Sequence, residues 1–238
     1  MASRSAQQLG RSRGDADRSP WRVRFNTIHQ ALRERITLLK YPPGTRLDVD
    51  ALAAEYGVSR TPIRNVLLRL EQEGLVATRH GVGTTVAEID FRHLRDVVAF
   101  RVQLAELIGR LDPQPPGAET LREMDELTDA CRQLLDAPDL ERFAYVDIHV
   151  HHCITRLIGN EMLRRTYDEL YFRNARMWFY FLPRLHLKAE IAVFLDDIRL
   201  TRKAMERGDV AAVGYITRNA ISSVLYRLDE LLDEATGR

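Results

Sequence analysis

Two arginines and a threonine near the start of one segment have the chemistry to contact DNA. Arg60, Thr61 and Arg64 stand together at the beginning of a stretch with helical periodicity. The apolar residues of this stretch recur at three- and four-residue spacings and form its expected buried face: Ile63, Val66, Leu67 and Leu70. An arginine fork can bind O6 and N7 of guanine in the major groove, while short hydroxyls hold phosphate. The pattern therefore predicts a DNA-recognition helix.

Two earlier helices are expected to position this recognition helix. Asp48 suits the N-cap of a short helix whose Leu52 faces inward, and Gly57 allows a positive φ at its end. Ser59 stands where it could cap the recognition helix. A still earlier helix is expected to stop at Pro42-Pro43. Its apolar face comprises Ile28, Leu32, Ile36 and Leu39.

The segment after the recognition helix is typical of a β-hairpin. Residues 75–78 and 84–86 have the composition of two strands, and turn-forming residues separate them. Arg79, His80 and Gly81 are expected at the tip of the hairpin. A glycine there lets the backbone approach a phosphate or the minor groove closely. These three residues are therefore candidate DNA contacts.

The whole stretch PPGTRLDVDALAAEYGVSRTPIRNVLLRLEQEGLVATRHGVGTTV resembles the DNA-binding domain of GntR-family bacterial transcription regulators. The motifs PPG-x-RL, LA-x-x-x-GVSRTPIR, L-x-RLE-x-EGLV and an R-x-G wing occur in that order. The resemblance implies a winged helix-turn-helix of three helices plus a β-hairpin wing, with double-stranded DNA as its partner. The DNA contacts that it implies are Arg46, Ser59, Arg60, Thr61, Arg64 and the wing tip at His80 and Gly81.

Charge and composition agree with a DNA-binding N-terminal part. Residues 1–90 hold 14 Lys and Arg against 10 Asp and Glu, whereas the remainder holds 21 against 24. We expect residues 1–20 to be a disordered basic tail and residues 21–88 to be the DNA-binding domain. The chain has no apolar run long enough for a membrane span and no secretory signal, which predicts a cytoplasmic protein. Cys131 and Cys153 are expected to be small buried apolar groups.

A second domain of different texture is expected at residues 91–238. Helical periodicity runs through it, and turn-forming residues divide it into six helices without strand signals. A short linker at residues 87–91 would join it to the first domain. The predicted fold is therefore mainly α, with a C-terminal all-α helical bundle.

Asp147 and His151 are the residues of the second domain with the clearest chemistry. They lie four apart on one helical face, which suits two ligands of one metal ion. Together with Arg101, the Ile158-Gly159-Asn160 turn and the Gly208-Asp209 turn, they resemble the FCD effector domain of the FadR-type branch of GntR regulators. Many such domains bind a divalent metal through one aspartate and three histidines. The third and fourth positions fall here on Ile198 and Ala220, which cannot ligate.

Two interpretations of this site follow. A divalent transition metal is the one candidate cofactor, and it would need a shifted ligand set drawn from neighbouring residues: His149, His152, His186, Asp196, Asp197 and Asn219. We favour the other, in which Asp147 and His151 form a hydrogen-bonded pair that lines a metal-free pocket. In that pocket Arg101 is either an anchor for a ligand carboxylate or half of a structural salt bridge, and Asn219 is a further ligand-binding candidate.

Seven aromatic residues gather between positions 167 and 181, and most are expected in the core or in a dimer contact. They are Tyr167, Tyr171, Phe172, Trp178, Phe179, Tyr180 and Phe181. A more apolar ligand, such as a long acyl group, becomes plausible if these rings reach the pocket.

The sequence thus predicts a regulator rather than an enzyme. We expect a homodimeric repressor that binds a pseudo-palindromic operator and responds to a small metabolite, an organic acid, in its C-terminal bundle. The alternative is a metal-dependent hydrolase that uses Asp147 and His151. Against this alternative, the sequence has no nucleophile with a neighbouring base and no phosphate-binding glycine loop.

Overall fold

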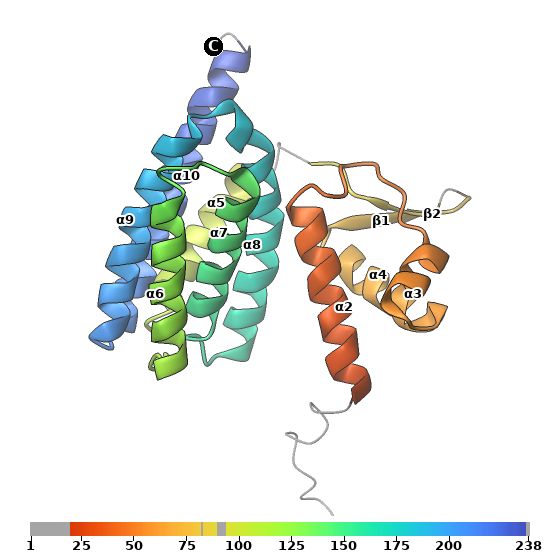
Figure 1. The fold of residues 1–238 in the computed structure, drawn as a ribbon, viewed down its shortest axis with the longest axis horizontal. Coiled ribbons are helices and arrows are strands. Elements are labelled where there is room, and N and C mark those ends of the chain that lie inside the picture. The colour runs from red at the N-terminus through yellow and green to blue at the C-terminus, as the bar shows by residue number, and fades with distance from the viewer. Residues whose placement is uncertain (1–19, 82, 90–93, 237–238) are drawn as a thin grey trace, which may run out of the picture. The chain divides into compact units, whose positions relative to one another are not determined.

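A computed structural model describes residues 20–81, 83–89 and 94–236 of the chain (Figure 1). Residues 1–19 of the basic tail predicted at 1–20, and residues 90 and 91 of the linker predicted at 87–91, lie outside the described residues. Pro20, the last residue of the predicted tail, is the first residue of a helix. Apart from the short segment Thr37–Leu39, the chain divides between Glu88 and Ile89 into two compact units. Each unit has its own core and is described by itself.

The first unit is a winged helix-turn-helix, as predicted. Its elements, in order, are α2 (Pro20–Thr37), α3 (Val49–Tyr56), α4 (Arg60–Gln72), β1 (Val76–Arg79) and β2 (Gly83–Val86). The two strands pair antiparallel, with Val76 opposite Val86 and Arg79 opposite Gly83. Buried apolar residues of α2 and α4 and of both strands form the core: Ile28, Leu32, Ile36, Ile63, Val66, Leu67, Leu70, Val76 and Val86.

The caps of α3 are those expected, but the predicted cap of α4 is not formed. The carboxylate of Asp48 accepts hydrogen bonds from the backbone N–H groups of Asp50 and Ala51, at 2.8 and 3.0 Å. Gly57 closes the helix with a φ of 61°. Ser59 holds the N-cap position of α4, yet its side chain makes no capping hydrogen bond. The hydroxyl of Ser59 is therefore not committed to the end of its own helix.

The end of α2 differs from the prediction. The helix ends at Thr37, before the two prolines, and Leu39 adopts a left-handed φ of 57° outside the helix. The N–H of Lys40 then donates to the carbonyl of Arg35 at 2.9 Å. This hydrogen bond across a left-handed residue is the Schellman pattern, which satisfies carbonyls at a helix end. A local C-cap, and not the proline pair, therefore stops α2.

The second unit consists, in its described part, of the six predicted α-helices and a short 3-10 turn that the sequence analysis did not predict. They are α5 (Leu94–Leu107), α6 (Ala118–Gln133), α7 (Leu140–Thr155), α8 (Glu161–Phe181), η2 (Leu182–Arg184), α9 (Leu187–Glu206) and α10 (Val210–Thr236). Cys131 and Cys153 are buried and free, as expected, and burial raises the pKa values of their thiols to about 11 and about 12. Among the described helices, none combines the length and apolar character needed to cross a membrane.

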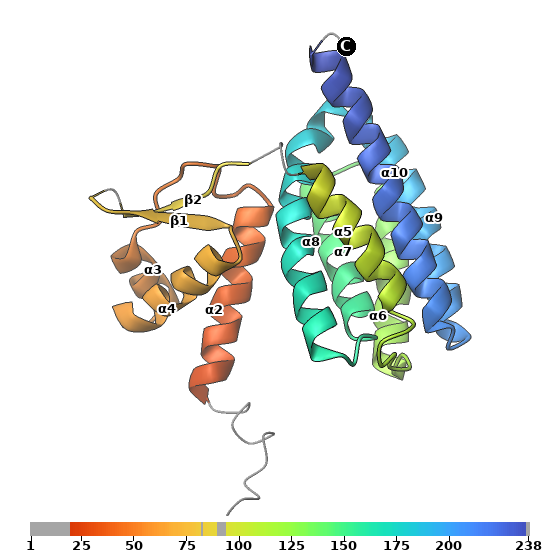
Figure 2. The ribbon, with the colours of Figure 1, turned by 180° about the vertical axis from the view of Figure 1, so that it is seen from behind.

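Helices α5 and α10 pack side by side through small residues (Figure 2). A Cβ placed on Gly214 of α10 would lie 2.6 Å from the carbonyl oxygen of Ala105 in α5. A Cβ on Gly109, just beyond α5, would lie 2.3 Å from the Cα of Ala211. Since the atoms met are backbone atoms, neither clash is relieved by turning a side chain. The absence of side chains at these two positions is what permits the close approach.

We predict that Gly214→Ala destabilises the protein by about 1–3 kcal/mol, the usual cost of overpacking a tight contact. Alanine is more favourable than glycine in a helix by about 1 kcal/mol. The cost of the steric clash is expected to exceed this gain. Urea or thermal unfolding of the purified chain measures the change. Gly117→Ala is the matched control, because a Cβ there meets nothing within 4 Å. Equal stability of Gly214→Ala and the wild type would contradict the close-packing argument.

Candidate functional site

The predicted DNA-contacting residues of α4 lie at its exposed N-terminal end. Ser59, Arg60, Thr61 and Arg64 are all exposed. The guanidinium of Arg60 forms an ion pair with the carboxylate of Asp50 in α3. Arg64, by contrast, forms no hydrogen bond or ion pair within the described residues. Arg64 can therefore meet a base without losing an internal partner, whereas Arg60 must first leave Asp50.

The wing presents the second group of predicted DNA contacts. Arg79, His80 and Gly81 are exposed, and Gly81 has a φ of 79°, a conformation that favours glycine. Helix α4 is tied to this hairpin, because the carboxylate of Glu71 accepts a hydrogen bond from the N–H of Thr78 at 2.7 Å. The recognition helix and the wing are thus held in one fixed arrangement.

Arg46 lies at the base of the wing. It forms an isolated antiparallel bridge with Thr85, and the N–H of the following Leu47 donates to the carbonyl of Thr84 at 2.9 Å. The segment before α3 therefore runs along β2. A Cβ placed on Gly83 would lie 3.6 Å from the Nε of Arg46, so the guanidinium covers that glycine. Arg46 is exposed and stands beside the hairpin that carries the other predicted wing contacts.

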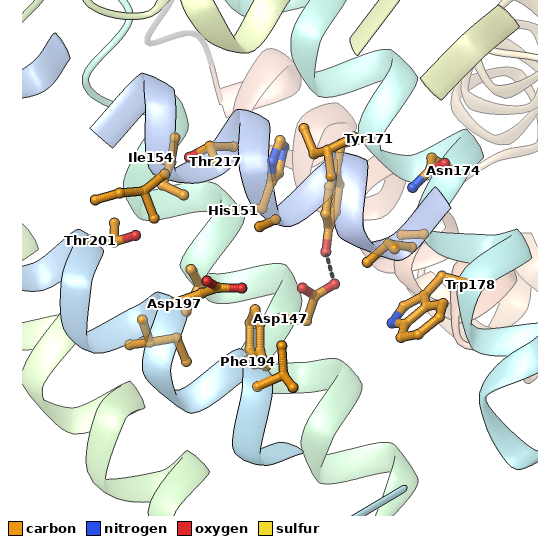
Figure 3. A pocket seen from close by; sticks show the side chains of 18 of the residues that line it. Asp147, His151, Ile154, Tyr171, Asn174, Trp178, Phe194, Asp197, Thr201 and Thr217 are labelled. Atoms are coloured by element: carbon orange, nitrogen blue, oxygen red, sulfur yellow. Dashed lines mark hydrogen bonds between the residues drawn. The ribbon is translucent and has the colours of Figure 1, made fainter. Parts of the chain in front are cut away.

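The second unit encloses a cavity among α5, α7, α8, α9 and α10 (Figure 3). It contains about 920 Å³ of space without protein atoms, including the part open to solvent. Apolar side chains make up much of its wall: Phe143, Val150, Ile154, Trp178, Val193, Phe194, Ile198, Ile216, Ile221 and Val224. A few polar and charged groups interrupt this wall, as in pockets that orient a small ligand.

Asp147 and His151 both line the cavity, but the hydrogen-bonded pair predicted between them is not formed. The Nε2 of His151 lies 3.0 Å from the carboxylate of Asp168 on α8. Asp147 instead accepts a hydrogen bond at 2.7 Å from the hydroxyl of Tyr171. The ring of His151 stacks on the ring of Tyr171, with centroids 3.6 Å apart. Tyr171 therefore contacts both residues. The hydrogen-bond partners of Asp147 and His151 come from α8, so the spacing of these two residues along α7 does not reveal them.

Arg101 is a buried cation that faces the same cavity. Its side chain is 4% exposed, and its Nε has no hydrogen-bond partner among the described residues. The guanidinium carbon lies 5.8 Å and 5.5 Å from the ring centroids of Tyr167 and Tyr171. Within the same part of the chain Arg101 forms no ion pair, so the structural salt bridge considered from the sequence is not formed. A donor of the guanidinium fork is left for another acceptor.

Three further charged residues line the cavity, and the sequence analysis did not assign them to it as a group. Glu190 of α9 pairs with Arg227 of α10 at 3.0 Å. Asp197 of α9 also lines the cavity but has neither a hydrogen bond nor an ion pair within the described residues. Glu190 and Asp197 interrupt the otherwise apolar inner face of α9, which includes Ile191, Phe194, Leu195 and Ile198. Charges at such positions were the signal available from the sequence.

Burial governs the protonation of the two aspartates in the wall. It raises the pKa of Asp147 to about 6, although the Tyr171 hydrogen bond and the charge of Arg101 act in the opposite direction. It likewise raises the pKa of Asp197 to about 6, against the opposing charge of Arg227. Removing a carboxylate from water disfavours its charged form. Both groups are therefore costly to ionise in the absence of a cationic partner.

The side chains present do not fit the divalent metal considered from the sequence as the less favoured interpretation. Ile198 and Ala220 line the cavity, as the spacing count requires for the third and fourth ligand positions, but neither side chain can donate to a metal. Within the described residues no group of three or more His, Cys, Asp or Glu has a metal-binding arrangement. The shifted ligand set is thus not assembled.

Several of the residues considered for that shifted set have other partners. His149 Nδ1 lies 2.8 Å from the carbonyl of Tyr145, and His186 caps α9. Asp196 pairs with Arg199. Asn219, predicted to bind ligand, is exposed, does not line the cavity and accepts hydrogen bonds from Arg218. Asn219 therefore lies outside the cavity wall, because α10 turns the neighbouring Ala220 toward the cavity instead.

The aromatic cluster divides between core and cavity. Tyr167, Tyr171 and Trp178 line the cavity, while Phe172, Phe179 and Phe181 are buried outside its wall. Tyr180 is exposed. The expectation of core positions holds for part of the cluster, and the three cavity residues give the pocket an aromatic side.

These two units define a class of protein, a winged-helix DNA-binding regulator with a helical pocket domain. Residues 25–86 match the family described as bacterial regulatory proteins of the gntR family, and residues 96–223 match the FCD domain. The chain therefore belongs to the GntR family of transcriptional regulators, among its members with an FCD effector-binding domain.

Similar proteins agree with this assignment. The chain is 29% identical over 212 residues to an uncharacterised HTH-type transcriptional regulator of Streptomyces ambofaciens, over 88% of this chain and 87% of that protein. It is 27% identical over 151 residues to the gluconate operon transcriptional repressor of Bacillus subtilis, over 58% and 57%. The solved structure of E. coli McbR/YncC has a TM-score of 0.71 at 20% identity and covers 88% of this chain and 98% of that one. This structural likeness shows the fold.

We predict that Asp147→Asn stabilises the protein relative to the wild type increasingly as the pH rises. The unfolded carboxyl ionises near its ordinary pKa of about 3.9, whereas the folded carboxyl keeps its proton up to about 6. The wild type therefore loses stability across this window, and the asparagine variant does not. The difference between the two should grow by on the order of 2 kcal/mol from about pH 4 to about pH 7.

Thermal or chemical unfolding at several pH values measures this difference. Asp129→Asn is the control, because Asp129 is an exposed partner of Arg132 on α6. A gap between Asp147→Asn and wild type that stays constant with pH would show that Asp147 is not the buried, hard-to-ionise group described here.

We predict that Arg64→Ala weakens binding to the operator by about 1–3 kcal/mol and relaxes the preference at one base pair, the result expected when an arginine fork on guanine is lost. Fluorescence anisotropy on operator and random duplexes measures both effects. Arg122→Ala is the control, since this exposed arginine of α6 pairs with Glu126 in the other unit. Equal losses on both duplexes would instead identify Arg64 as a phosphate contact.

Proposed function

We propose that this protein is a ligand-responsive repressor that binds a pseudo-palindromic operator as a homodimer. Family membership supports the general role of a transcriptional regulator. One winged helix reads only a few base pairs, so useful affinity requires two copies on one duplex. The proposed DNA contacts are Arg46, Ser59, Arg60, Thr61, Arg64, Arg79, His80 and Gly81. The role of a repressor is supported by two relatives, a gluconate operon repressor and a probable D-xylose utilization operon repressor.

We further propose that the effector binds in the cavity of the second unit through a carboxylate at Arg101. The single observation that carries this proposal is the buried guanidinium of Arg101, a residue of the cavity wall whose Nε has no hydrogen-bond partner among the described residues. Arginine presents a planar fork of donors that matches a carboxylate in geometry and charge. Asp147 and His151 line the same cavity and are proposed to contact the bound molecule. The effector class is thus a small organic acid.

The effector would act by preferring one shape of the helical unit over another. An effector that binds the two shapes with different affinities shifts operator affinity by that difference, typically about 1–3 kcal/mol. The cavity suits this role because five of the helices contribute residues to its wall. A bound effector would therefore contact most helices of the unit and could change how they pack. Because the family consists of transcriptional regulators, we do not propose the metal-dependent hydrolase.

The experiment that tests this function combines genomic footprinting with effector titration. The full chain should protect a discrete two-fold symmetric sequence, run as a dimer in light scattering, and change its operator affinity with one member of a panel of acids such as gluconate, lactate, glycolate and citrate. Arg101→Lys keeps the charge but loses the fork, so it should retain DNA binding and lose the response. Failure to protect any discrete sequence would overturn the regulator assignment, and an unchanged response in Arg101→Lys would overturn the carboxylate site.

A further inference from the structure

The charged groups of the cavity wall do not balance one another. Two guanidinium groups, Arg101 and Arg227, face it together with three carboxylates, Asp147, Glu190 and Asp197. His151 lies beside Asp168, a carboxylate outside the wall, so this pair adds no net charge when both are ionised. With all groups ionised the cavity therefore carries one negative charge in excess. A ligand with only a carboxylate would increase this excess.

Of the three carboxylates in the wall, Asp197 is the one with neither a hydrogen bond nor an ion pair to a described residue. Arg227 pairs with Glu190 at 3.0 Å, and Asp147 accepts a hydrogen bond from the hydroxyl of Tyr171. Asp197 has the charge of Arg227 nearby but no hydrogen bond or ion pair with any described residue. Figure 3 shows its side chain in the cavity together with that of Asp147. A half-buried carboxylate without a donor is costly unless a bound group supplies one.

Arg101 and Asp197 thus form two open anchors of opposite charge on one cavity. They come from different helices, α5 and α9. Among the described residues, the Nε of Arg101 has no hydrogen-bond partner and the carboxylate of Asp197 has neither a hydrogen bond nor an ion pair. Arg101 is nine-tenths buried, at 4% exposure, so bulk water does not replace the missing acceptor. The aromatic and aliphatic wall offers an apolar surface beside these anchors.

We propose that the effector is an aminocarboxylate, whose carboxylate binds Arg101 and whose ammonium group binds Asp197. The proposal rests on the effector site proposed above and narrows its ligand class. Such a ligand is neutral overall, so it satisfies both open anchors without adding to the negative excess of the wall. An ammonium group also offers three donors, which suits the carboxylate of Asp197 and the hydroxyl of the neighbouring Thr201, another residue of the wall. The rest of the ligand lies against the apolar wall.

A cation held between carboxylates is the competing occupant, and the donor set disfavours a metal ion. The two positions at which further ligands would stand are Ile198 and Ala220. Their apolar side chains suit the carbon skeleton of an organic ligand and leave a metal short of donors.

Matched ligand triplets test the proposal on the full-length protein by thermal shift and calorimetry. Each triplet has an aminocarboxylate, the acid without the amine and the amine without the acid: leucine, isocaproate and isoamylamine; phenylalanine, hydrocinnamate and phenethylamine; γ-aminobutyrate, butyrate and butylamine. In at least one triplet the aminocarboxylate should stabilise the protein more than both singly charged members. Asp197→Asn should weaken that ligand about tenfold or more, the scale of a lost buried charge partner, and should not weaken the acid, because the variant removes a negative charge from the wall. Asp196→Asn is the matched control, an exposed neighbour that pairs with Arg199.

The outcomes separate this inference from the proposed function. If no aminocarboxylate exceeds its acid, or if Asp197→Asn weakens acid and aminocarboxylate equally, the inference is overturned. In that case, acids that bind the wild type and fail to bind Arg101→Lys would still support the organic-acid site of the proposed function. Stabilisation by zinc or manganese that depends on Asp197 would also overturn the inference. The comparison within wild-type protein decides the question even if a variant fails to fold.

Discussion

The burial of Arg101 beside an open cavity is the constraint on which the second unit depends. A guanidinium removed from water is costly unless acceptors or aromatic faces compensate it. Here the rings of Tyr167 and Tyr171 lie near its charge. Burial raises the pKa of Asp147, and the charge of Arg101 acts in the opposite direction. Tyr171 joins these groups, since its hydroxyl binds Asp147 and its ring stacks on His151. The unit therefore keeps a charged, partly unsatisfied wall in its interior, which is the property of a binding site and not of a core.

In the first unit, the contacts that stabilise the fold are separate from most of the side chains proposed to bind DNA. Asp48 and Gly57 fix the ends of α3, and Glu71 fixes the wing to α4 through the backbone of Thr78. These contacts use residues other than the exposed arginines. The side chains proposed to bind DNA are therefore not needed to hold the unit together. Arg60 is the exception, since Asp50 holds it in the absence of DNA. An anionic duplex would compete with that carboxylate for the same guanidinium.

The sequence was sufficient for features that depend on local spacing and insufficient for those that depend on contacts between helices. The caps of α3, the hairpin and the six helices of the second unit follow from residues near one another in the chain, and they were predicted, whereas the predicted Ser59 cap of α4 is not formed. Leu39 was misplaced because a left-handed C-cap at a leucine has no strong sequence signal. The hydrogen-bond partners predicted for Asp147 and His151 were also wrong, because their actual partners, Tyr171 and Asp168, lie on α8. Asp197 was not recognised as a binding group of the cavity, because the charge near it comes from Arg227 on α10. Helix packing, and not spacing, selects such pairs.

The central claim is that the guanidinium of Arg101 is an unfilled binding group. The most direct measurement is the proton–nitrogen correlation signal of the Arg101 Nε, assigned by its loss in Arg101→Lys and followed during titration with the most stabilising carboxylate of the ligand panel. This account predicts that the signal shifts with ligand and that its exchange with water slows, because a carboxylate takes up the free donor. A signal that stays unchanged at ligand concentrations that saturate the thermal shift would contradict it.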